Sequence, residues 1–90
     1  MSETRYFRVR GRVQGVGFRA ATSDAARRLS LDGWVRNRGD GDVELMARGT
    51  PEDLDALRDW LHEGPGMARV GEVSEQAADA ADLPSPFTVA

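Results

Sequence analysis

Two polar residues of this 90-residue chain, Arg19 and Asn37, stand in settings that favour chemistry. Arg19 follows a glycine-rich segment, residues 14–18, at the point where an alternating pattern gives way to a helical one. Glycines let backbone N–H groups turn toward a ligand, and a helix start adds unpaired N–H groups and the positive end of a dipole. The segment therefore predicts a site for a phosphate-like anion, with Arg19 as its charged partner.

The predicted helix after this segment starts without a capping side chain. Within this helix no acidic residue precedes Asp24, and Arg19 places a positive charge in the first turn, where it is unfavourable by roughly 0.3–1 kcal/mol. The second predicted helix differs, because Thr50 can cap it and Pro51 suits its first position. A bound anion would satisfy the first helix start. The alternative is a glycine turn capped by water, with Arg19 in solvent.

Asn37 lies at the end of a strand-like run, just before the glycine-rich turn at 39–41. A carboxamide there can hold a water molecule, because it donates and accepts hydrogen bonds at once. The alternative is ordinary turn chemistry, in which asparagine is common. Which of the two applies depends on whether the fold places Asn37 beside the glycine-rich segment.

The elements that must position these residues follow from periodicity and turn signals. Alternation predicts strands and a 3.6-residue spacing predicts helices, while residues 76–82 are expected to form a loop. The strands are expected at 6–13, 34–38, 43–47, 68–73 and 87–89, and the helices at 18–29 and 51–63.

This order predicts an α+β fold, a ferredoxin-like split βαβ plait (βαββαβ plus a short final strand). Its two helices lie on one face of a mainly antiparallel sheet, in a single domain over residues 1–90. In such a plait the first loop and the end of the second strand can lie at the same edge of the sheet. The glycine segment and Asn37 occupy those two places.

Charge is unevenly divided along the chain, although the net charge is only −3. Residues 1–38 carry nine arginines against three acids, a balance of +6, and residues 39–90 carry a balance of −9. The basic half suggests an anionic ligand, and the acidic half argues against nonspecific nucleic-acid binding. Alternatively, the two sets interleave on the folded surface.

Cysteine and lysine are absent from the sequence, and this restricts the chemistry. Disulfides, thiolate zinc sites and cysteine nucleophiles are excluded, and so is a Walker-type phosphate loop, which needs lysine. No run approaches the ~20 apolar residues of a membrane span, and no targeting signal is visible. We therefore expect a cytoplasmic protein that binds neither membranes nor nucleic acid.

Other candidate residues have simpler explanations. His62, the one histidine, is expected near the end of the second helix, where it suits the helix dipole. Asp40 and Asp42 could suggest a cation site, but a hairpin turn accounts for them better. No Ser-His-Asp set and no two-histidine metal spacing occurs.

Two long motifs resemble the signatures of the acylphosphatase family. Gly11 to Arg19 (GRVQGVGFR) resembles the first signature, and Gly33 to Asn37 (GWVRN), followed by residues 41–43 and Gly49, resembles the second. The resemblance extends over nearly the whole chain. It implies the plait described above and hydrolysis of the carboxyl–phosphate bond of acyl phosphates, giving a carboxylate and inorganic phosphate. It implies no metal, no cofactor and a monomer.

The resemblance also implies roles for individual residues. Arg19 and the backbone amides before it would bind the phosphoryl group, and Asn37 would position the attacking water. The substrate phosphate could itself take the proton of that water. The loop residues implied are Gln14, Gly15, Val16, Gly17 and Phe18.

One departure from the family pattern is Arg38, where several relatives carry a small hydroxyl residue. It could alter the placement of the water or attract acidic substrates. Two other functions stay open. One is a module that binds a phosphometabolite without turnover. The other is single-stranded RNA binding, which the sequence disfavours, because the central strands lack paired stacking aromatics.

Overall fold

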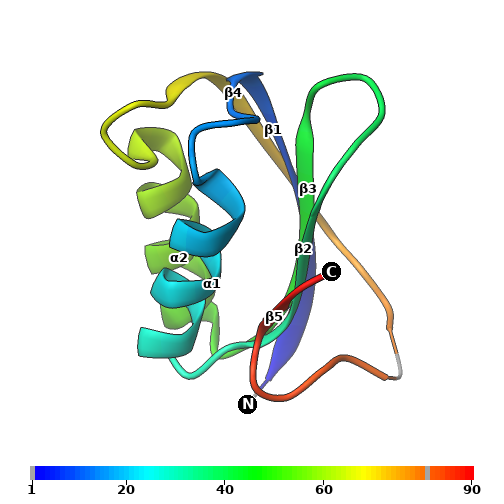
Figure 1. Ribbon diagram of the computed structural model, residues 1–90. Helices are drawn as coiled ribbons and strands as arrows, with labels where there is room; N and C mark the ends of the chain where they lie inside the picture. The colour runs from blue at the N-terminus through cyan, green and yellow to red at the C-terminus, as the bar shows by residue number, and fades with distance from the viewer. Residues whose placement is uncertain (1, 81) are drawn as a thin grey trace.

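The computed structural model describes residues 2–80 and 82–90. Alternating strands and amphipathic helices follow one another in the order expected from the sequence (Figure 1). The elements are β1 (Glu3–Arg12), α1 (Phe18–Arg28), β2 (Asp32–Asn37), β3 (Val43–Gly49), α2 (Pro51–Glu63), β4 (Arg69–Ala77) and β5 (Thr88–Val89).

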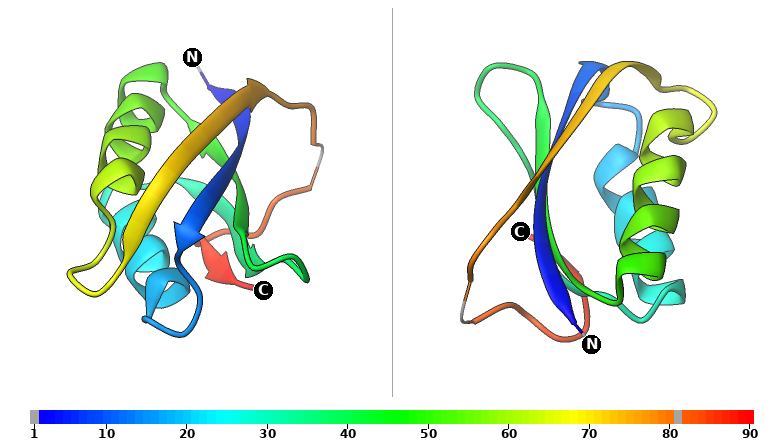
Figure 2. Two further views of the ribbon diagram at one scale, coloured as in Figure 1. Left: turned by 90° about the horizontal axis from the view of Figure 1, so that it is seen from above. Right: turned by 180° about the vertical axis from the view of Figure 1, so that it is seen from behind.

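The strands form one sheet in the order β4-β1-β3-β2-β5. Neighbouring strands are antiparallel except for β2 and β5, which run parallel. Both helices cover the same face of this sheet and leave the other face open (Figures 1 and 2). The predicted ferredoxin-like plait with a mainly antiparallel sheet is confirmed.

The hydrophobic core lies between the sheet and the helices. Phe7, Leu45 and Val35 form a row across three paired strands, and all three side chains are fully buried. Leu54 and Leu57 of α2 are fully buried as well. Burial of a side chain of this size stabilises the fold by roughly 1.5–3 kcal/mol, so these residues hold the two layers together.

Two strands are longer than the local pattern indicates. β1 begins at Glu3, because residues 3–6 pair with β3, and β4 continues to Ala77, because its end pairs with Arg5. The prediction of a loop over 76–82 is therefore wrong at its start. Residues 78–80 and Asp82 do lie outside regular structure, and Ala81 lies outside the described residues.

The basic first half of the chain pairs with the acidic second half across the open face of the sheet. Arg8 lies 2.7 Å from a carboxylate oxygen of Asp40 and 2.7 Å from one of Asp42. Arg38 lies 3.0 Å from Glu44, whose side chain is nearly buried. The two sets of charges therefore interleave, and much of the basic excess is neutralised within the fold.

Candidate functional site at the start of α1

The turn into α1 depends on two glycines in left-handed conformations. Gly15 has φ 77° and Gly17 has φ 75°, values that L side chains rarely adopt. A Cβ atom built on either glycine would meet no atom within 4 Å. The glycines are therefore required by backbone conformation, and the space beside them is open.

The loop presents a run of unpaired backbone donors. Within the described chain, the N–H groups of residues 14–20 donate no hydrogen bond, and the first N–H to do so is that of Ala21, to Gly17 O at 3.0 Å. α2 differs, because Asp53 N donates to Thr50 Oγ1 at 3.1 Å and two acids lie in its first turn. The start of α2 is satisfied from within, whereas the start of α1 leaves its donors free for an anion.

Arg19 adds a full positive charge to these donors. Its side chain is exposed, and among residues 2–80 and 82–90 it pairs with no carboxylate. The first turn of α1 contains no acidic residue. A cation at this end of a helix opposes the helix dipole, and an anion bound beside it would remove that conflict.

A cavity of about 200 Å³ brings Arg19 and Asn37 together. By volume it could hold roughly six water molecules, which is enough for a phosphate group and the atoms next to it. Asn37 is exposed, and its carboxamide makes no hydrogen bond within the described chain. The remaining lining residues are Val13, Gly15, Gly17, Phe18, Ala20 and Val89.

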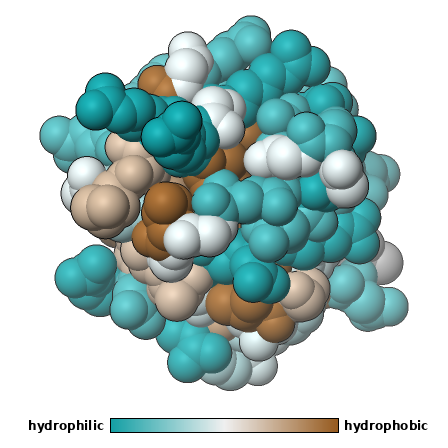
Figure 3. All heavy atoms as spheres, turned by 45° about the horizontal axis from the view of Figure 1, so that its top comes forward, coloured by the Kyte–Doolittle hydropathy of each residue, from teal (hydrophilic) through white to brown (hydrophobic). Residues whose placement is uncertain are grey.

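The loop, the β2–β3 hairpin and β5 meet at this end of the molecule (left view of Figure 2). Figure 3 brings this end forward and shows apolar surface set among hydrophilic side chains. β5 reaches the site because Val89 pairs with Val35 and because Arg27 Nε donates to Phe87 O at 2.7 Å. No local sequence signal places Val89 at the site, since only tertiary pairing brings it there.

Three of the predicted loop residues have side chains that are engaged elsewhere in the fold. Gln14 Nε2 donates to Arg38 O at 2.8 Å and to Asp42 O at 2.9 Å. Val16 packs against the core, and Phe18 is buried with its ring centroid 5.8 Å from that of Trp60. These three residues can therefore offer a ligand only their backbone amides.

The hairpin residues considered as candidates are engaged with one another. Arg38 binds Asp40 and Glu44 at 3.0 Å each, and it does not line the cavity. Asp40 and Asp42 both accept a hydrogen bond from Arg8 at 2.7 Å. The guanidinium thus lies where a metal cation bound to these two carboxylates would lie. No group of three or more potential metal-ligating residues occurs within the described ranges.

The electrostatics of this hairpin follow from its hydrogen bonds. The backbone N–H of Asp42, followed by the Arg38 guanidinium, lowers the pKa of Asp40. Burial raises the pKa of Glu44, but hydrogen bonds from Tyr6, Arg36 and Arg38 outweigh that effect, and the pKa lies below its ordinary value. These carboxylates are therefore held ionised beside their arginines.

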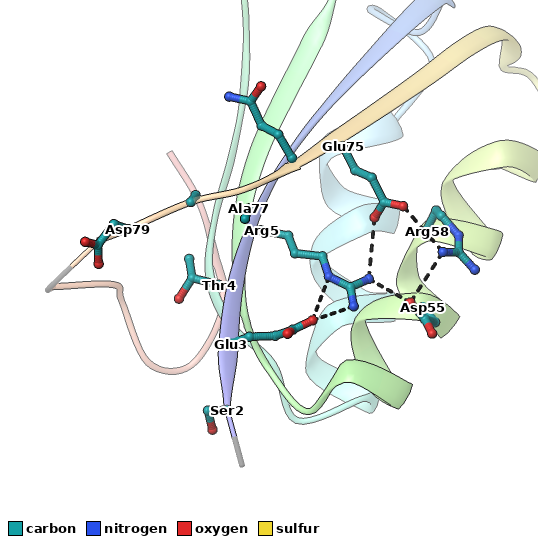
Figure 4. A pocket seen from close by; sticks show the side chains of 11 residues that line it. Ser2, Glu3, Thr4, Arg5, Asp55, Arg58, Glu75, Ala77 and Asp79 are labelled. Carbon is teal, nitrogen blue, oxygen red and sulfur yellow. Dashed lines mark hydrogen bonds and ion pairs between the residues drawn. The ribbon is translucent and has the colours of Figure 1, made fainter.

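A wider hollow of about 610 Å³ lies at the other end of β1 (Figure 4). Its charged groups pair with one another: Arg5 binds Asp55 at 2.7 Å and Glu75 at 3.4 Å, and Arg58 binds both of these acids. Its arginines are thus already paired with carboxylates, unlike Arg19. Among these two hollows, only the one at the start of α1 offers an arginine without a carboxylate partner in the described chain.

The open sheet face has no adjacent pair of aromatic rings among its described residues. Tyr6 and Trp34 are separated by Met46 on the strand between them. The Tyr6 hydroxyl donates to Glu44 at 2.6 Å, and the Arg36 guanidinium lies 4.5 Å from the centroid of the Trp34 ring. The stacking platform typical of RNA-binding plaits is not formed.

Comparison with known proteins identifies the family of the chain. A sequence profile described as Acylphosphatase matches residues 5–89. An acylphosphatase from Acidovorax sp. (strain JS42) is 52% identical over 81 residues, which is 90% of this chain and 84% of the relative.

Neither helix among the described residues is long and apolar enough to cross a membrane.

Solved structures show the same fold. An acylphosphatase from Coxiella burnetii superimposes with a TM-score of 0.93 at 39% identity, covering 99% of this chain and 93% of that one. An acylphosphatase from Bacillus subtilis gives a TM-score of 0.92 at 32% identity, covering 100% and 99% of the two chains.

The fold is a small α+β plait, and its first helix begins with backbone N–H groups that are unpaired within the described residues and lie beside a cavity. The chain belongs to the acylphosphatase family, and thereby to the enzymes that hydrolyse the carboxyl–phosphate bond of acyl phosphates.

Proposed function

We propose that Arg19 and the amides of residues 14–18 bind the phosphoryl group of an acyl phosphate and that Asn37 positions the attacking water. The observation that carries this proposal is the run of unpaired N–H groups beside an unpaired arginine, with a free carboxamide over the same cavity. Phosphate oxygens accept hydrogen bonds from N–H donors, and a guanidinium can bind two of them at once.

The reaction needs little covalent help from the protein. The oxygen of the water attacks phosphorus, the bond between phosphorus and the acyl oxygen breaks, and its electron pair leaves with the carboxylate. A phosphoryl oxygen of the substrate takes the proton of the water, so no side chain acts as base. Arg19 and the loop amides stabilise the charge on the equatorial oxygens, and Asn37 holds the water in line. Metal is not required in this scheme.

Hydrolysis of benzoyl phosphate with a chelator present tests the assignment. We expect turnover by the wild type and a loss of about 10²–10³ in rate for Arg19→Ala, because one charge-stabilising contact is removed. Asn37→Ala should lower kcat while inorganic phosphate, measured as an inhibitor, still binds, because the carboxamide contacts water and not the phosphoryl group.

Arg28→Ala is the matched control for Arg19→Ala. Arg28 is an exposed arginine of the same helix, lies in its last turn and does not line the cavity. Wild-type turnover by Arg19→Ala would overturn the role given to Arg19. Phosphate binding without any hydrolysis by the wild type would favour a binding module instead.

We further propose that the protein acts in the cytoplasm, as a monomer, on small acyl phosphates. The absence of cysteine suits a reducing compartment. The groups that the proposed reaction uses, Arg19, the loop amides and Asn37, all border one cavity within the chain. Light scattering that gave twice the chain mass of 9.8 kDa would contradict the monomer.

A further inference from the structure

We infer that the side chain of Gln14 is a positioning residue, which sets the place of Asn37 relative to the phosphate-binding loop. This inference rests on the proposed function, because it concerns how the two halves of that site are held together. Gln14 acts through the hairpin, and its side chain does not line the cavity.

The carboxamide of Gln14 joins the loop to the β2–β3 hairpin. Its Nε2 atom donates to Arg38 O at 2.8 Å and to Asp42 O at 2.9 Å, so both of its hydrogens are used. In the part of the chain that the structure describes, no backbone hydrogen bond connects residues 13–17 with residues 38–42. The side chain of Gln14 is thus the hydrogen-bonded link between them.

The two carbonyls that Gln14 binds lie where they can control Asn37. Arg38 directly follows Asn37. Its N–H donates to Asp42 O at 2.8 Å, and this backbone hydrogen bond is the last rung of the hairpin before the turn. Gln14 therefore bonds to both sides of that rung. Ion pairs from Arg8 and Arg38 hold the side chains of the turn, whereas Gln14 bonds its backbone carbonyls to the loop.

The phosphate-binding part of the loop has separate supports. Gly15 and Gly17 set its turn, and the buried ring of Phe18 anchors it against α1 and α2. Loss of the Gln14 carboxamide should therefore leave phosphate binding in place and free the hairpin. A displacement of about 1 Å between reacting groups can lower a rate by about 10²-fold, so the effect should fall on kcat.

Gln14→Met removes the donor and keeps the length of the side chain, and Gln76→Met is the matched control. Gln76 is the only other glutamine and lies exposed on β4. With benzoyl phosphate, we expect Gln14→Met to lower kcat by about 10-fold or more, and KM and phosphate inhibition to change by less than about 3-fold. The control should retain the wild-type kcat. A rise in KM at unchanged kcat would overturn the inference.

A double-mutant cycle separates positioning from general damage to the fold. If Gln14 acts through Asn37, adding Gln14→Met to Asn37→Ala should lower kcat by less than about 2-fold, because the group being positioned is already absent. A full 10-fold loss in that background would show that Gln14 does not act through Asn37.

Hydrogen exchange gives a readout that does not depend on turnover. We expect Gln14→Met to speed exchange of the Arg38 amide by about 5-fold, since a hydrogen bond of about 1 kcal/mol that supports this rung is lost. Amides of α2 should be unaffected. Unchanged exchange at Arg38 would overturn the inference even if the enzyme proved inactive on benzoyl phosphate, whereas inactivity with the expected exchange would contradict only the proposed function.

Discussion

Some residues at the candidate site have side chains without a hydrogen-bond or ion-pair partner in the described parts of the chain, and others have side chains that are already paired. The side chains of Arg19 and Asn37 make no hydrogen bond or ion pair within the described chain, although both border the cavity. Arg38, one residue further, is bound to two carboxylates. Other arginines, such as Arg28, also lack an ion pair among the described residues, so what marks the candidate site is that a free guanidinium and a free carboxamide border the same cavity.

Gly17 supports a prediction at this scale. Gly17→Ala places a Cβ in open space, so its effect comes from the left-handed conformation alone, at about 1–2 kcal/mol. We expect the free energy of unfolding in urea to fall by about this amount. Phosphate inhibition should also weaken, because the loop amides would relax away from the cavity.

Gly39→Ala is the control for this prediction. Gly39 also has open space around the position of a Cβ, but its φ is not in the left-handed region. Its substitution should change the free energy of unfolding by less than about 0.5 kcal/mol. Equal effects of the two alanines would show that the conformation of Gly17 is not what the loop requires.

The two helices differ in a way that separates stability from function. α2 has its own cap at Thr50, with proline and two acids in its first turn, whereas α1 has Gly17 at its N-cap position and no side-chain cap. Caps are worth about 1 kcal/mol, so the fold forgoes this contribution at α1. An anion bound there would restore the missing hydrogen bonds and favourable charge.

Thr50→Ala tests this division of roles. We expect a loss of about 1 kcal/mol in the free energy of unfolding, because Asp53 N loses its acceptor, and an unchanged kcat on benzoyl phosphate. Thr50→Ser keeps the hydroxyl and should retain most of the wild-type stability. A large loss of kcat in Thr50→Ala would mean that α2 takes part in the site.

Element-level features were predictable where they depend on local pattern. The order of strands and helices, the capped start of α2 and the glycine turn into α1 all follow from residues near one another in sequence. The ends of β1 and β4 were not predictable, because residues 3–5 and 74–77 extend through pairing with distant strands. Pairing between strands decides such boundaries, and periodicity alone does not report it.

On the scale of the whole molecule, the plait assembles the site from three distant segments. The loop, the end of β2 and β5 meet because β1, β3 and β2 lie side by side in the sheet. The meeting of loop and β2 could be anticipated from the plait. The hydrogen bonds from Gln14 to the hairpin could not be anticipated, because they depend on side-chain geometry. The position of Val89 could not be anticipated either, because it depends on the pairing of β5 with β2.

Ion pairs between arginines and carboxylates connect distant parts of the chain, and they predict how the free energy of unfolding depends on pH. The Arg5 guanidinium lowers the pKa of Asp55, and the hairpin hydrogen bonds lower those of Asp40 and Glu44. A carboxyl whose pKa is lower in the folded chain stabilises the fold above its unfolded pKa, near 4. That stability is lost as the pH falls through the folded value. We expect the free energy of unfolding to decrease from about pH 5 downward.

Glu44→Gln isolates the hairpin's share of this dependence. Glu44 is nearly buried beneath Arg36 and Arg38, which lie 2.6 and 3.0 Å away. Its neutral replacement should be less stable at pH 7, since both arginines lose a charged partner, and should lose less stability than wild type between about pH 5 and 3. Urea unfolding at constant ionic strength measures both effects. Glu63→Gln, an exposed change of the same charge, should follow the wild-type curve, and an equally flattened curve for Glu63→Gln would place the effect in net charge and not in the hairpin.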